Sequence, residues 1–266
     1  MLKFWMLVLS LFLFRGVHAV EIIAHRGASH DAPENTIAAC KLGWQQGAES
    51  VELDIHQSKD GKIIVMHDAD TKRTAGLDKK IVEQTLEEIR VLEAGSWKGA
   101  GWKGEPIPTL DEVLPLIPQG KRLVIEIKCG PEILPELQRV LKASGRGDKE
   151  FVIIGFGYDT MKQAKQMFPT IPIFYLSNFK KNKETGAVTP SIEELITKAK
   201  AAHLDGLNLH HSAPLDQTGV QKIKDAGLQI YFWTVDDAIV ARRLQEMGAQ
   251  GLTTNRPAWL RQQLKH

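Results

Sequence analysis

Two predicted strands carry acidic side chains in an alternating pattern that could bind a metal ion. The segment SVELDIHQ contains Glu52 and Asp54, and the segment RLVIEIK contains Glu126. Successive side chains of a strand point to opposite faces, so these carboxylates share the face opposite to the apolar residues. Three buried acids without partners would be very costly, and Ca²⁺ or Mg²⁺ suits ligands that are all oxygen atoms. Internal ion pairs with Arg26 or Lys128 are the alternative.

Two histidines are expected beside these carboxylates. His25 follows the apolar run of IIAHRGAS, and His67 ends a strand that the Asp-Gly pair at 60–61 turns back toward the acids. A two-residue turn there places His67 opposite Asp54, and a four-residue loop places it opposite Glu52. Two imidazoles near a metal suit a general acid and a general base, and the sequence does not assign the two roles.

Arg26 and Lys128 add positive charge to the same region. An arginine can hold two phosphate oxygens at once, and a lysine adds a point charge. Together with one divalent cation, these residues would form an anion site suited to a phosphodiester. The sequence has no convincing glycine-rich nucleotide loop, no Cys/His zinc spacing and no G-x-S-x-G nucleophile. The pattern therefore favours a metal-assisted phosphodiester site with two candidate acid/base groups.

The elements that must position these residues alternate regularly along the chain. Strands are expected at 21–25, 49–57, 122–128, 151–156, 171–176, 205–210, 228–235 and 250–254. Helical patterns include 36–46, 131–143, 159–167, 192–202, 216–226 and 237–247. Eight strand–helix units in a single domain spanning 20–266 fit a (β/α)8 barrel, with a doubly wound sheet as the alternative. A hairpin-containing insertion is expected after the second strand, at about 57–108, where loops of such barrels carry function.

The first 19 residues differ in composition from the rest. They contain Lys3, an apolar run from Phe4 to Phe14 and then Val17-His18-Ala19, which is typical of a cleaved export signal. The run is too short for the ~20 residues of a membrane helix, so no stable membrane insertion is expected after its removal. We therefore expect an exported protein, periplasmic or secreted, with an uncleaved membrane-associated leader as the alternative.

Charge and cysteine content limit the partners that the chain could have. Without residues 1–19, the 34 basic residues become 32, equal to the 32 acidic ones, which gives no support for binding nucleic acid. The expected partner is a small-molecule substrate. Cys40 and Cys129 could form a disulfide or remain as two buried thiols, because sequence does not show their geometry.

The motifs together resemble one known family, the glycerophosphodiester phosphodiesterases. HRGAS…APENT, VELDIHQSKDGKIIVMHD, EIK, WTV and GLTTNRP occur in the order of that family and cover nearly all of the chain after the leader. The resemblance implies a (β/α)8 barrel that hydrolyses glycerophosphodiesters to sn-glycerol 3-phosphate and an alcohol. His25 and His67 resemble the acid/base pair. The resemblance further implies metal ligands at Glu52, Asp54 and Glu126, phosphate contacts at Arg26 and Lys128, supporting residues at Glu34 and Asn35, and a substrate-pocket aromatic at Trp233.

Three residues depart from the family pattern. Asp236 stands where Asn is frequent, Asn255 where Asp is common, and His30 where Gly is common. We expect these positions to touch the rim and not the metal and histidine set, so that they affect substrate preference more than activity.

Other interpretations of individual residues remain open. Glu34 could be an acid that favours the helix dipole, Asn35 a helix N-cap, and Trp233 a filler of the barrel. At the level of function, the alternatives are a lysophospholipase D-like or sphingomyelinase D-like enzyme on the same barrel, a non-catalytic phosphodiester-binding protein, and an unrelated barrel enzyme such as an isomerase.

Overall fold

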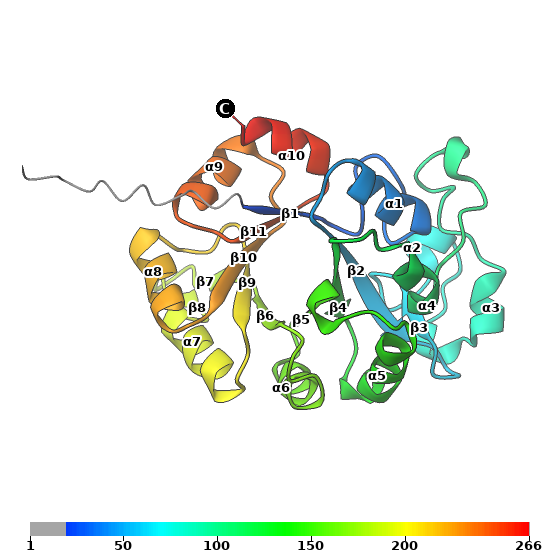
Figure 1. The fold of residues 1–266 in the computed structure, drawn as a ribbon, viewed down its shortest axis with the longest axis horizontal. Coiled ribbons are helices and arrows are strands. Elements are labelled where there is room, and N and C mark those ends of the chain that lie inside the picture. Colours follow the sequence, from blue (N-terminus) through cyan, green and yellow to red (C-terminus); the bar gives the residue numbers. More distant parts are fainter. Residues whose placement is uncertain (1–19, 266) are drawn as a thin grey trace, which may run out of the picture.

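The computed structural model describes residues 20–265, and the predicted leader at 1–19 lies outside this range. Eight parallel strands form a closed barrel, because β1 pairs with both β2 and β11 (Figure 1). They are β1 (Glu21–Ala24), β2 (Ser50–Gln57), β4 (Arg122–Ile127), β5 (Phe151–Gly155), β6 (Ile173–Ser177), β9 (Gly206–His210), β10 (Gln229–Trp233) and β11 (Gly251–Thr254). The predicted (β/α)8 barrel is confirmed, and closure excludes the open doubly wound sheet.

Helices surround the barrel, as Figure 1 shows. They are α1 (Ile37–Gln45), α5 (Leu134–Ala143), α6 (Tyr158–Met167), α7 (Ile192–Ala201), α8 (Gln217–Asp225), α9 (Ala238–Glu246) and α10 (Pro257–Gln263). Side chains of Thr36, Ser191, Asp216 and Asp237 accept hydrogen bonds from backbone N–H groups of the first turn, which fixes where four of these helices begin.

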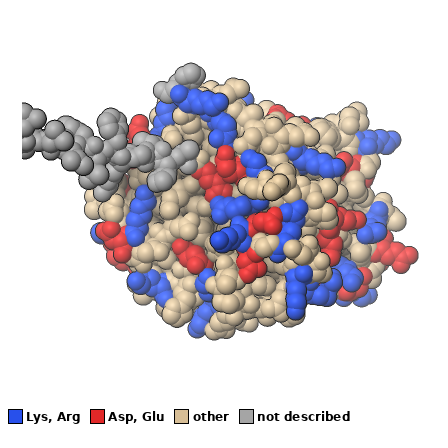
Figure 2. Space-filling view, viewed as in Figure 1, with Lys and Arg blue, Asp and Glu red and all other residues tan. Residues whose placement is uncertain are grey.

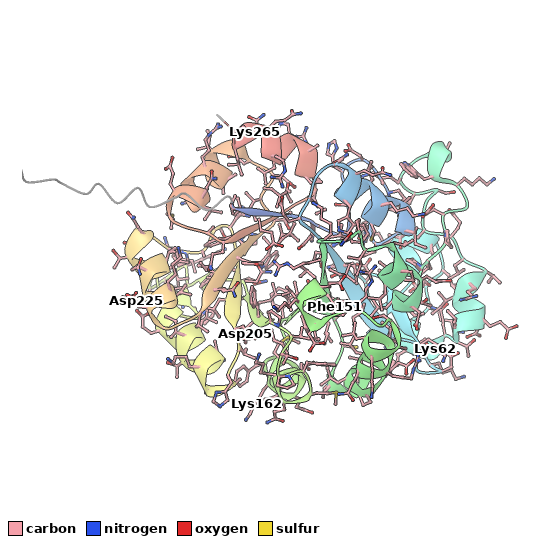
Figure 3. The ribbon with its side chains drawn as sticks, viewed as in Figure 1. Lys62, Phe151, Lys162, Asp205, Asp225 and Lys265 are labelled. Atoms are coloured by element: carbon pink, nitrogen blue, oxygen red, sulfur yellow. The ribbon has the colours of Figure 1, made fainter. Side chains whose placement is uncertain are left out.

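The barrel strands pack an apolar outer face against the helices, whereas their inner face carries both apolar side chains and the carboxylates. Val51, Leu53 and Ile55 of β2 belong to the apolar layer between strands and helices. Phe151 at the start of β5, labelled in Figure 3, belongs to the same layer and is almost fully buried. A separate apolar cluster fills the barrel interior, and Val124 of β4 belongs to it. Since Glu126 has the parity of Val124, the predicted inward orientation of the carboxylates is confirmed.

The segment after β2 forms a hairpin and a small subdomain against the side of the barrel (Figure 1). It contains β3 (Ile63–Val65), α2 (Lys72–Ala75), α3 (Leu86–Arg90) and the 3₁₀ turns η1 (Ile81–Glu83) and η2 (Ala100–Trp102), followed by α4 (Leu110–Val113). Its own apolar cluster includes Ile64, Met66, Ile81, Ile89 and Ile107.

The remaining short elements lie between the barrel units. They are η3 (Leu114–Leu116), η4 (Pro131–Ile133), η5 (Asp148–Glu150) and the hairpin strands β7 (Lys180–Lys181) and β8 (Val188–Thr189). Cys40 is buried, Cys129 is partly buried, and both are free thiols, so the disulfide alternative is not realised.

The β2–β3 hairpin has a register between the two that the sequence suggested. Ile55 lies opposite Val65, so Leu53 would fall opposite His67, and both predicted registers are wrong by one residue. The cause is a three-residue loop: the Ser58 N–H donates to the Lys62 carbonyl, and Gly61 adopts a left-handed conformation with φ of 77°. This is the turn-plus-bulge geometry that glycine favours.

Basic and acidic side chains are interspersed over the face shown in Figure 2. This distribution agrees with the near-zero net charge of the chain after the leader. Among the described residues, no helix combines the length and the apolar character needed to cross a membrane.

Candidate active site

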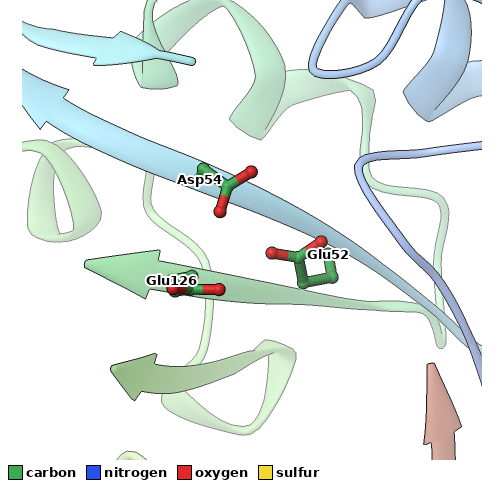
Figure 4. A group of neighbouring side chains, drawn as sticks. All are labelled: Glu52, Asp54 and Glu126. Atoms are coloured by element: carbon green, nitrogen blue, oxygen red, sulfur yellow. The ribbon is translucent and has the colours of Figure 1, made fainter. Parts of the chain in front are cut away.

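Three carboxylates converge at the inner face of two neighbouring strands. Figure 4 shows Glu52 and Asp54 on β2 and Glu126 on β4, with their side chains turned toward one another. One oxygen from each lies within 4.8 Å of the others, and all three residues are buried. The pairing of Asp54 with Glu126 in the parallel β2–β4 register brings them to the same level of the barrel. Two residues separated by 72 positions thus become immediate neighbours through one strand pairing.

The carboxylate cluster is short of positive charge. Burial, followed by repulsion from Asp54 and Glu126, raises the pKa of Glu52 well above its usual range. Burial and the Asp54 carboxylate likewise raise the pKa of Glu126 to about 7. Raised values of this kind mean that the charged forms of these side chains lack sufficient compensation.

Arg26 and Lys128 provide part of that compensation. The Arg26 Nε lies 3.2 Å from an oxygen of Asp54, and the Lys128 Nζ lies 2.8 Å from Glu126 and 3.5 Å from Asp54. The ion pairs considered as an alternative therefore exist. However, Arg26 also pairs with Glu34 at 2.9 Å, so its single charge is divided between Asp54 and Glu34.

The cluster fits a divalent cation. Glu52 Oε1 and Asp54 Oδ1 are buried, and neither has a hydrogen-bond partner. Buried oxygen atoms without partners are costly, and hard cations such as Ca²⁺ and Mg²⁺ take carboxylate ligands of this kind. Glu52, Asp54 and Glu126 are therefore the residues that could hold such an ion.

The loop after β1 brings Arg26 over the carboxylates through an unusual backbone conformation. Arg26 has a φ of 54° and Gly27 a φ of 82°, and the Arg26 N–H donates to Glu52 at 2.8 Å. A Cβ atom on Gly27 would lie only 2.3 Å from the carbonyl carbon of Ala39 in α1. Only glycine fits this position, because both the positive φ and the close helix backbone exclude a side chain.

Asn35 and Glu34 contact other residues of the site. Asn35 is not the N-cap of the following helix, and Glu34 is not an acid of its first turn. Asn35 is buried, has a φ of 59°, and donates from Nδ2 to Asp54 at 2.8 Å while its Oδ1 accepts from the Asp54 N–H at 3.1 Å. The N-cap of α1 is Thr36 and not Asn35. Glu34 lies outside the helix and pairs with Arg26 and Arg73.

His25 is held by an amide from the opposite end of the chain. Its Nδ1 lies 2.7 Å from Asn255 Oδ1, although the two residues are 230 positions apart. Burial and the nearby Arg26 charge lower the pKa of His25 to about 4, which the Asn255 hydrogen bond opposes only in part. The expectation that position 255 affects only the rim is therefore wrong, because Asn255 contacts the predicted acid/base histidine directly. His30, by contrast, is exposed and bonds to Asp31.

His67 has a different partner, the carboxylate of the next residue. Its Nδ1 lies 2.7 Å from Asp68 Oδ1, and its carbonyl lies 3.2 Å from the Nε2 of the buried His56. Burial alone would raise the pKa of Asp68, but hydrogen bonds from Arg73 and His67 lower it to about 2. An ionised carboxylate can only accept, so the hydrogen of this bond lies on Nδ1 of His67 and Asp68 fixes the orientation of the ring.

Arg73 joins the two loops that carry the predicted chemistry. From α2 it donates to both oxygens of Glu34, at 3.1 and 2.7 Å, and its Nε donates to Asp68 at 2.7 Å. Glu34 in turn holds Arg26, and Asp68 holds His67. The insertion thus positions both a phosphate-binding candidate and an acid/base candidate through one guanidinium group.

Trp233 lies on a second, aromatic part of the barrel mouth. It stacks edge-on against Phe156 and His210, with ring centroids 5.5 and 5.0 Å apart, and donates from Nε1 to the Asn208 carbonyl. The Lys128 Nζ lies 5.9 Å from the Phe156 ring, so this aromatic group borders the predicted phosphate site. Trp233 is partly buried and packs against the apolar cluster of the barrel interior, so it covers that cluster and also borders the mouth.

Four functional candidates escaped the sequence interpretation as site residues: Asp68, Arg73, Asp236 and Asn255. Asp68 carried a local signal, because a carboxylate next to a histidine can orient it. Asp236 and Asn255 were visible only as departures from the family pattern, and Arg73 carried no signal, because the partners of all three lie in distant segments.

Comparison with known proteins points to a single family. A sequence model described as the glycerophosphoryl diester phosphodiesterase family matches residues 25–259. Proteins named glycerophosphodiester phosphodiesterase from Caldanaerobacter subterraneus and Bacillus subtilis are 34% and 31% identical to the chain. These alignments cover 90% and 88% of this chain and 95% and 83% of those proteins.

Solved structures agree with the sequence comparison. The structure of an Oleispira antarctica phosphodiesterase in complex with the product sn-glycerol-3-phosphate has a TM-score of 0.83 and 31% identity. It covers 92% of this chain and 97% of its own. A glycerophosphodiester phosphodiesterase from Thermotoga maritima has a TM-score of 0.74 and 27% identity, with 92% and 98% coverage.

Proposed function

Because the chain belongs to the glycerophosphoryl diester phosphodiesterase family, we propose that it hydrolyses glycerophosphodiesters to sn-glycerol 3-phosphate and an alcohol, using one divalent cation, Ca²⁺ or Mg²⁺. One observation carries the proposal: two histidines with different Nδ1 partners border a cluster of three buried carboxylates. The product named for the Oleispira antarctica structure supports the choice of substrate class.

Glu52, Asp54 and Glu126 would hold the cation, which would supply positive charge for the phosphate oxygens. Arg26 and Lys128 bind further oxygens of the same phosphate and orient the diester. Their present carboxylate partners, Asp54 and Glu126, hold both side chains at the cluster. We expect binding by these fixed charges to hold the scissile phosphorus within reach of both histidines.

We assign the general base to His25 and the general acid to His67. His25 has a lowered pKa and a neutral amide partner, so the ring is uncharged near neutral pH and able to accept a proton. His67, whose Nδ1 donates to the Asp68 carboxylate, takes the remaining role of proton donor to the leaving group. A P–O bond forms to the attacking oxygen as His25 takes its proton, and the P–O bond to the alcohol breaks as His67 protonates the leaving oxygen.

The attacking oxygen belongs to water or to a glycerol hydroxyl of the substrate, and the two differ in product. Water gives glycerol phosphate directly, whereas the hydroxyl gives a cyclic phosphate that is hydrolysed in a second step. A time course of phosphorus NMR spectra distinguishes them, since only the second route accumulates a cyclic intermediate.

The experiment that tests the function is release of sn-glycerol 3-phosphate from glycerophosphocholine, with and without EDTA. We expect release that EDTA abolishes and that added Mg²⁺ or Ca²⁺ restores. Choline release from lysophosphatidylcholine without reaction of glycerophosphocholine would instead support a lysophospholipase D-like enzyme. Binding of glycerophosphocholine without turnover under any added divalent cation would support a binding protein.

Arg73 offers a test of the role of the insertion. Replacing it with Met removes the bonds to Glu34 and Asp68 at once, and we expect kcat/KM to fall about tenfold, because charged groups that orient the site lose their partner. Arg73→Lys should recover little, since a single ammonium group cannot hold two carboxylates in a fork. The matched control is Arg90→Met in the same insertion, which removes only an exposed ion pair with Glu112. Equal kcat/KM in both Met variants would contradict a positioning role.

We also propose that residues 1–19 direct export, on the basis of their composition alone. Cleavage after Ala19 would leave Val20 as the first residue, directly before β1. Mass spectrometry of the protein recovered from the producing cells tests this, and an intact Met1 in the exported fraction would contradict cleavage.

A further inference from the structure

We propose that Asn255 and Asp236 are positioning residues that hold His25 in the tautomer with its hydrogen on Nδ1, so that Nε2 is the proton acceptor. The inference deepens the proposed function, on which the assignment of His25 as a base rests. Asp236 follows β10, Asn255 follows β11 and His25 follows β1, so the chain of contacts joins three neighbouring strand ends.

The orientation of the Asn255 amide is determined by its neighbours. Its Nδ2 donates to Asp236 Oδ2, and a carboxylate can only accept. The amide oxygen must therefore face the other way, where it lies 2.7 Å from His25 Nδ1 and accepts from the Ser29 hydroxyl at 2.8 Å. An amide oxygen has no hydrogen to give, so the hydrogen in the contact with His25 belongs to the imidazole.

Asp236 is itself held rigidly. Its Oδ1 accepts from the Thr254 hydroxyl at 2.7 Å and from the Asn255 N–H at 2.8 Å. The carboxylate thus keeps one oxygen for the Asn255 side chain and uses the other to fix its own position. Rotation of the Asn255 amide by half a turn would place its NH₂ group against His25 and the Ser29 hydroxyl. The amide oxygen of Asn255 would then lie against a carboxylate oxygen of Asp236, and the two would repel. This cost selects a single orientation of the amide.

The consequence for His25 is chemical as well as geometric. A neutral imidazole carries one hydrogen, so a hydrogen on Nδ1 leaves the lone pair on Nε2. Asn255 lies between the Asp236 carboxylate and the His25 ring, so the ring contacts a neutral amide and not a charged group. The arrangement therefore orients His25 without the direct charge that His67 receives from Asp68.

Other charged groups around His25 do not replace this contact. Arg26 follows it in the same loop, Asp54 lies on the neighbouring β2, and Glu34 lies on the loop before α1. These groups act on His25 through charge, whereas its ring Nδ1 donates a hydrogen bond to Asn255. Within the described residues, the tautomer is thus specified by the Asn255–Asp236 pair.

The first test needs no variant. In ¹⁵N-histidine-labelled protein, the two ring nitrogens of His25 are assigned by the signals that disappear in His25→Gln. We expect Nδ1 to show the shift of a protonated nitrogen and Nε2 that of an unprotonated one at neutral pH, with or without added Mg²⁺. The opposite pattern would overturn the proposal, whatever substrate the enzyme prefers. This readout is independent of turnover, so its failure is distinct from failure of the proposed function.

Variants then test the contribution to turnover of glycerophosphocholine. Asn255→Leu removes the acceptor, and we expect kcat to fall about a hundredfold with KM changed by less than about threefold, since a wrong tautomer disables a base without removing substrate contacts. The ring signals of His25 should shift toward the other tautomer or a mixture. Asn182→Leu is the matched control, because Asn182 accepts only backbone bonds within the β7–β8 hairpin.

The double variant Asn255→Asp/Asp236→Asn exchanges the two groups and preserves the chain of donors and acceptors. We expect it to retain the Nδ1–H tautomer of His25. Its kcat should be at least tenfold higher than that of Asn255→Leu. Because a carboxylate then contacts the ring, the acid limb of its kcat/KM profile should move to higher pH. Wild-type turnover in Asn255→Leu, or an unchanged profile in the exchanged variant, would contradict the proposal. If Asn255→Leu fails to fold, the wild-type spectrum and the exchanged variant still decide.

Discussion

Replacing either histidine of the pair with asparagine is expected to lower kcat for glycerophosphocholine by about 10²–10⁴-fold, the usual contribution of one general acid or base. Both side chains are only partly buried, so the variants should fold. The matched control is His203→Asn, on the loop between α7 and β9, where φ is 55° and asparagine tolerates that conformation. Circular dichroism and kcat/KM of the three variants, measured side by side, check this prediction.

A substrate with a good leaving group separates the two roles. Glycerol p-nitrophenyl phosphate expels a phenolate that needs little protonation, so loss of the general acid should matter less for it. We expect His67→Asn to be at least tenfold less impaired on this substrate than on glycerophosphocholine, and His25→Asn to be equally impaired on both. The reverse pattern would exchange the two assignments, and near wild-type turnover in both variants would contradict the acid/base pair.

The second large effect concerns the carboxylates. Glu126→Gln and Asp54→Asn remove a charged oxygen from the cluster, and we expect both to lose at least about tenfold in divalent-cation affinity together with nearly all turnover. Isothermal titration with Ca²⁺ or Mg²⁺ measures the first effect independently of the substrate. The matched control is Glu132→Gln, on η4 after the same strand, whose carboxylate accepts from the Gly130 N–H outside the cluster. Wild-type affinity in both cluster variants would mean that the cation is held elsewhere.

Removing one of these charges should also stabilise the metal-free protein, in a pH-dependent manner. Glu126 has a folded-state pKa of about 7, above the unfolded value, so its protonation stabilises the fold at low pH and this stabilisation is lost as pH rises through 7. Glu126→Gln cannot ionise. Its Tm advantage over the metal-free wild type should therefore grow between about pH 4.5 and pH 7 and level off above, reaching at least about 4 °C.

The quantity to compare is the difference in Tm between Glu126→Gln and the metal-free wild type at each pH. Absolute Tm values would mislead, because His25 changes the stability with pH in the direction opposite to Glu126. Its lowered pKa favours the neutral ring in the fold, so stability from this group is lost as pH falls below the unfolded value. The contribution of His25 is common to both proteins and cancels. Saturating cation should reverse the order, since only the wild type gains full binding energy. A Tm difference independent of pH would show that Glu126 is not the strained carboxylate.

Local patterns in the sequence determined most of the barrel and the metal cluster. Alternation along SVELDIHQ and RLVIEIK determined that Glu52, Asp54 and Glu126 face away from the helices, because the two-residue period of a strand is a local property. The count of strand–helix units favoured a barrel for the same reason, but only the pairing of β1 with β11 excluded a doubly wound sheet. The insertion was also visible locally, but its hairpin register was not, since a single left-handed glycine shifts it by one residue.

Only the tertiary structure decided which groups contact the histidines. Closure of the barrel between β1 and β11 brings Asn255 to His25 across 230 positions, and packing of α2 against the loop after β1 brings Arg73 to Glu34. No periodicity encodes such contacts, because they depend on how distant strand ends meet in space. Strand alternation predicted that the carboxylates face the barrel interior. It could not predict that His25 would contact Asn255 and not one of the carboxylates. Sequence therefore determined which side chains enter the barrel, and folding determined their partners.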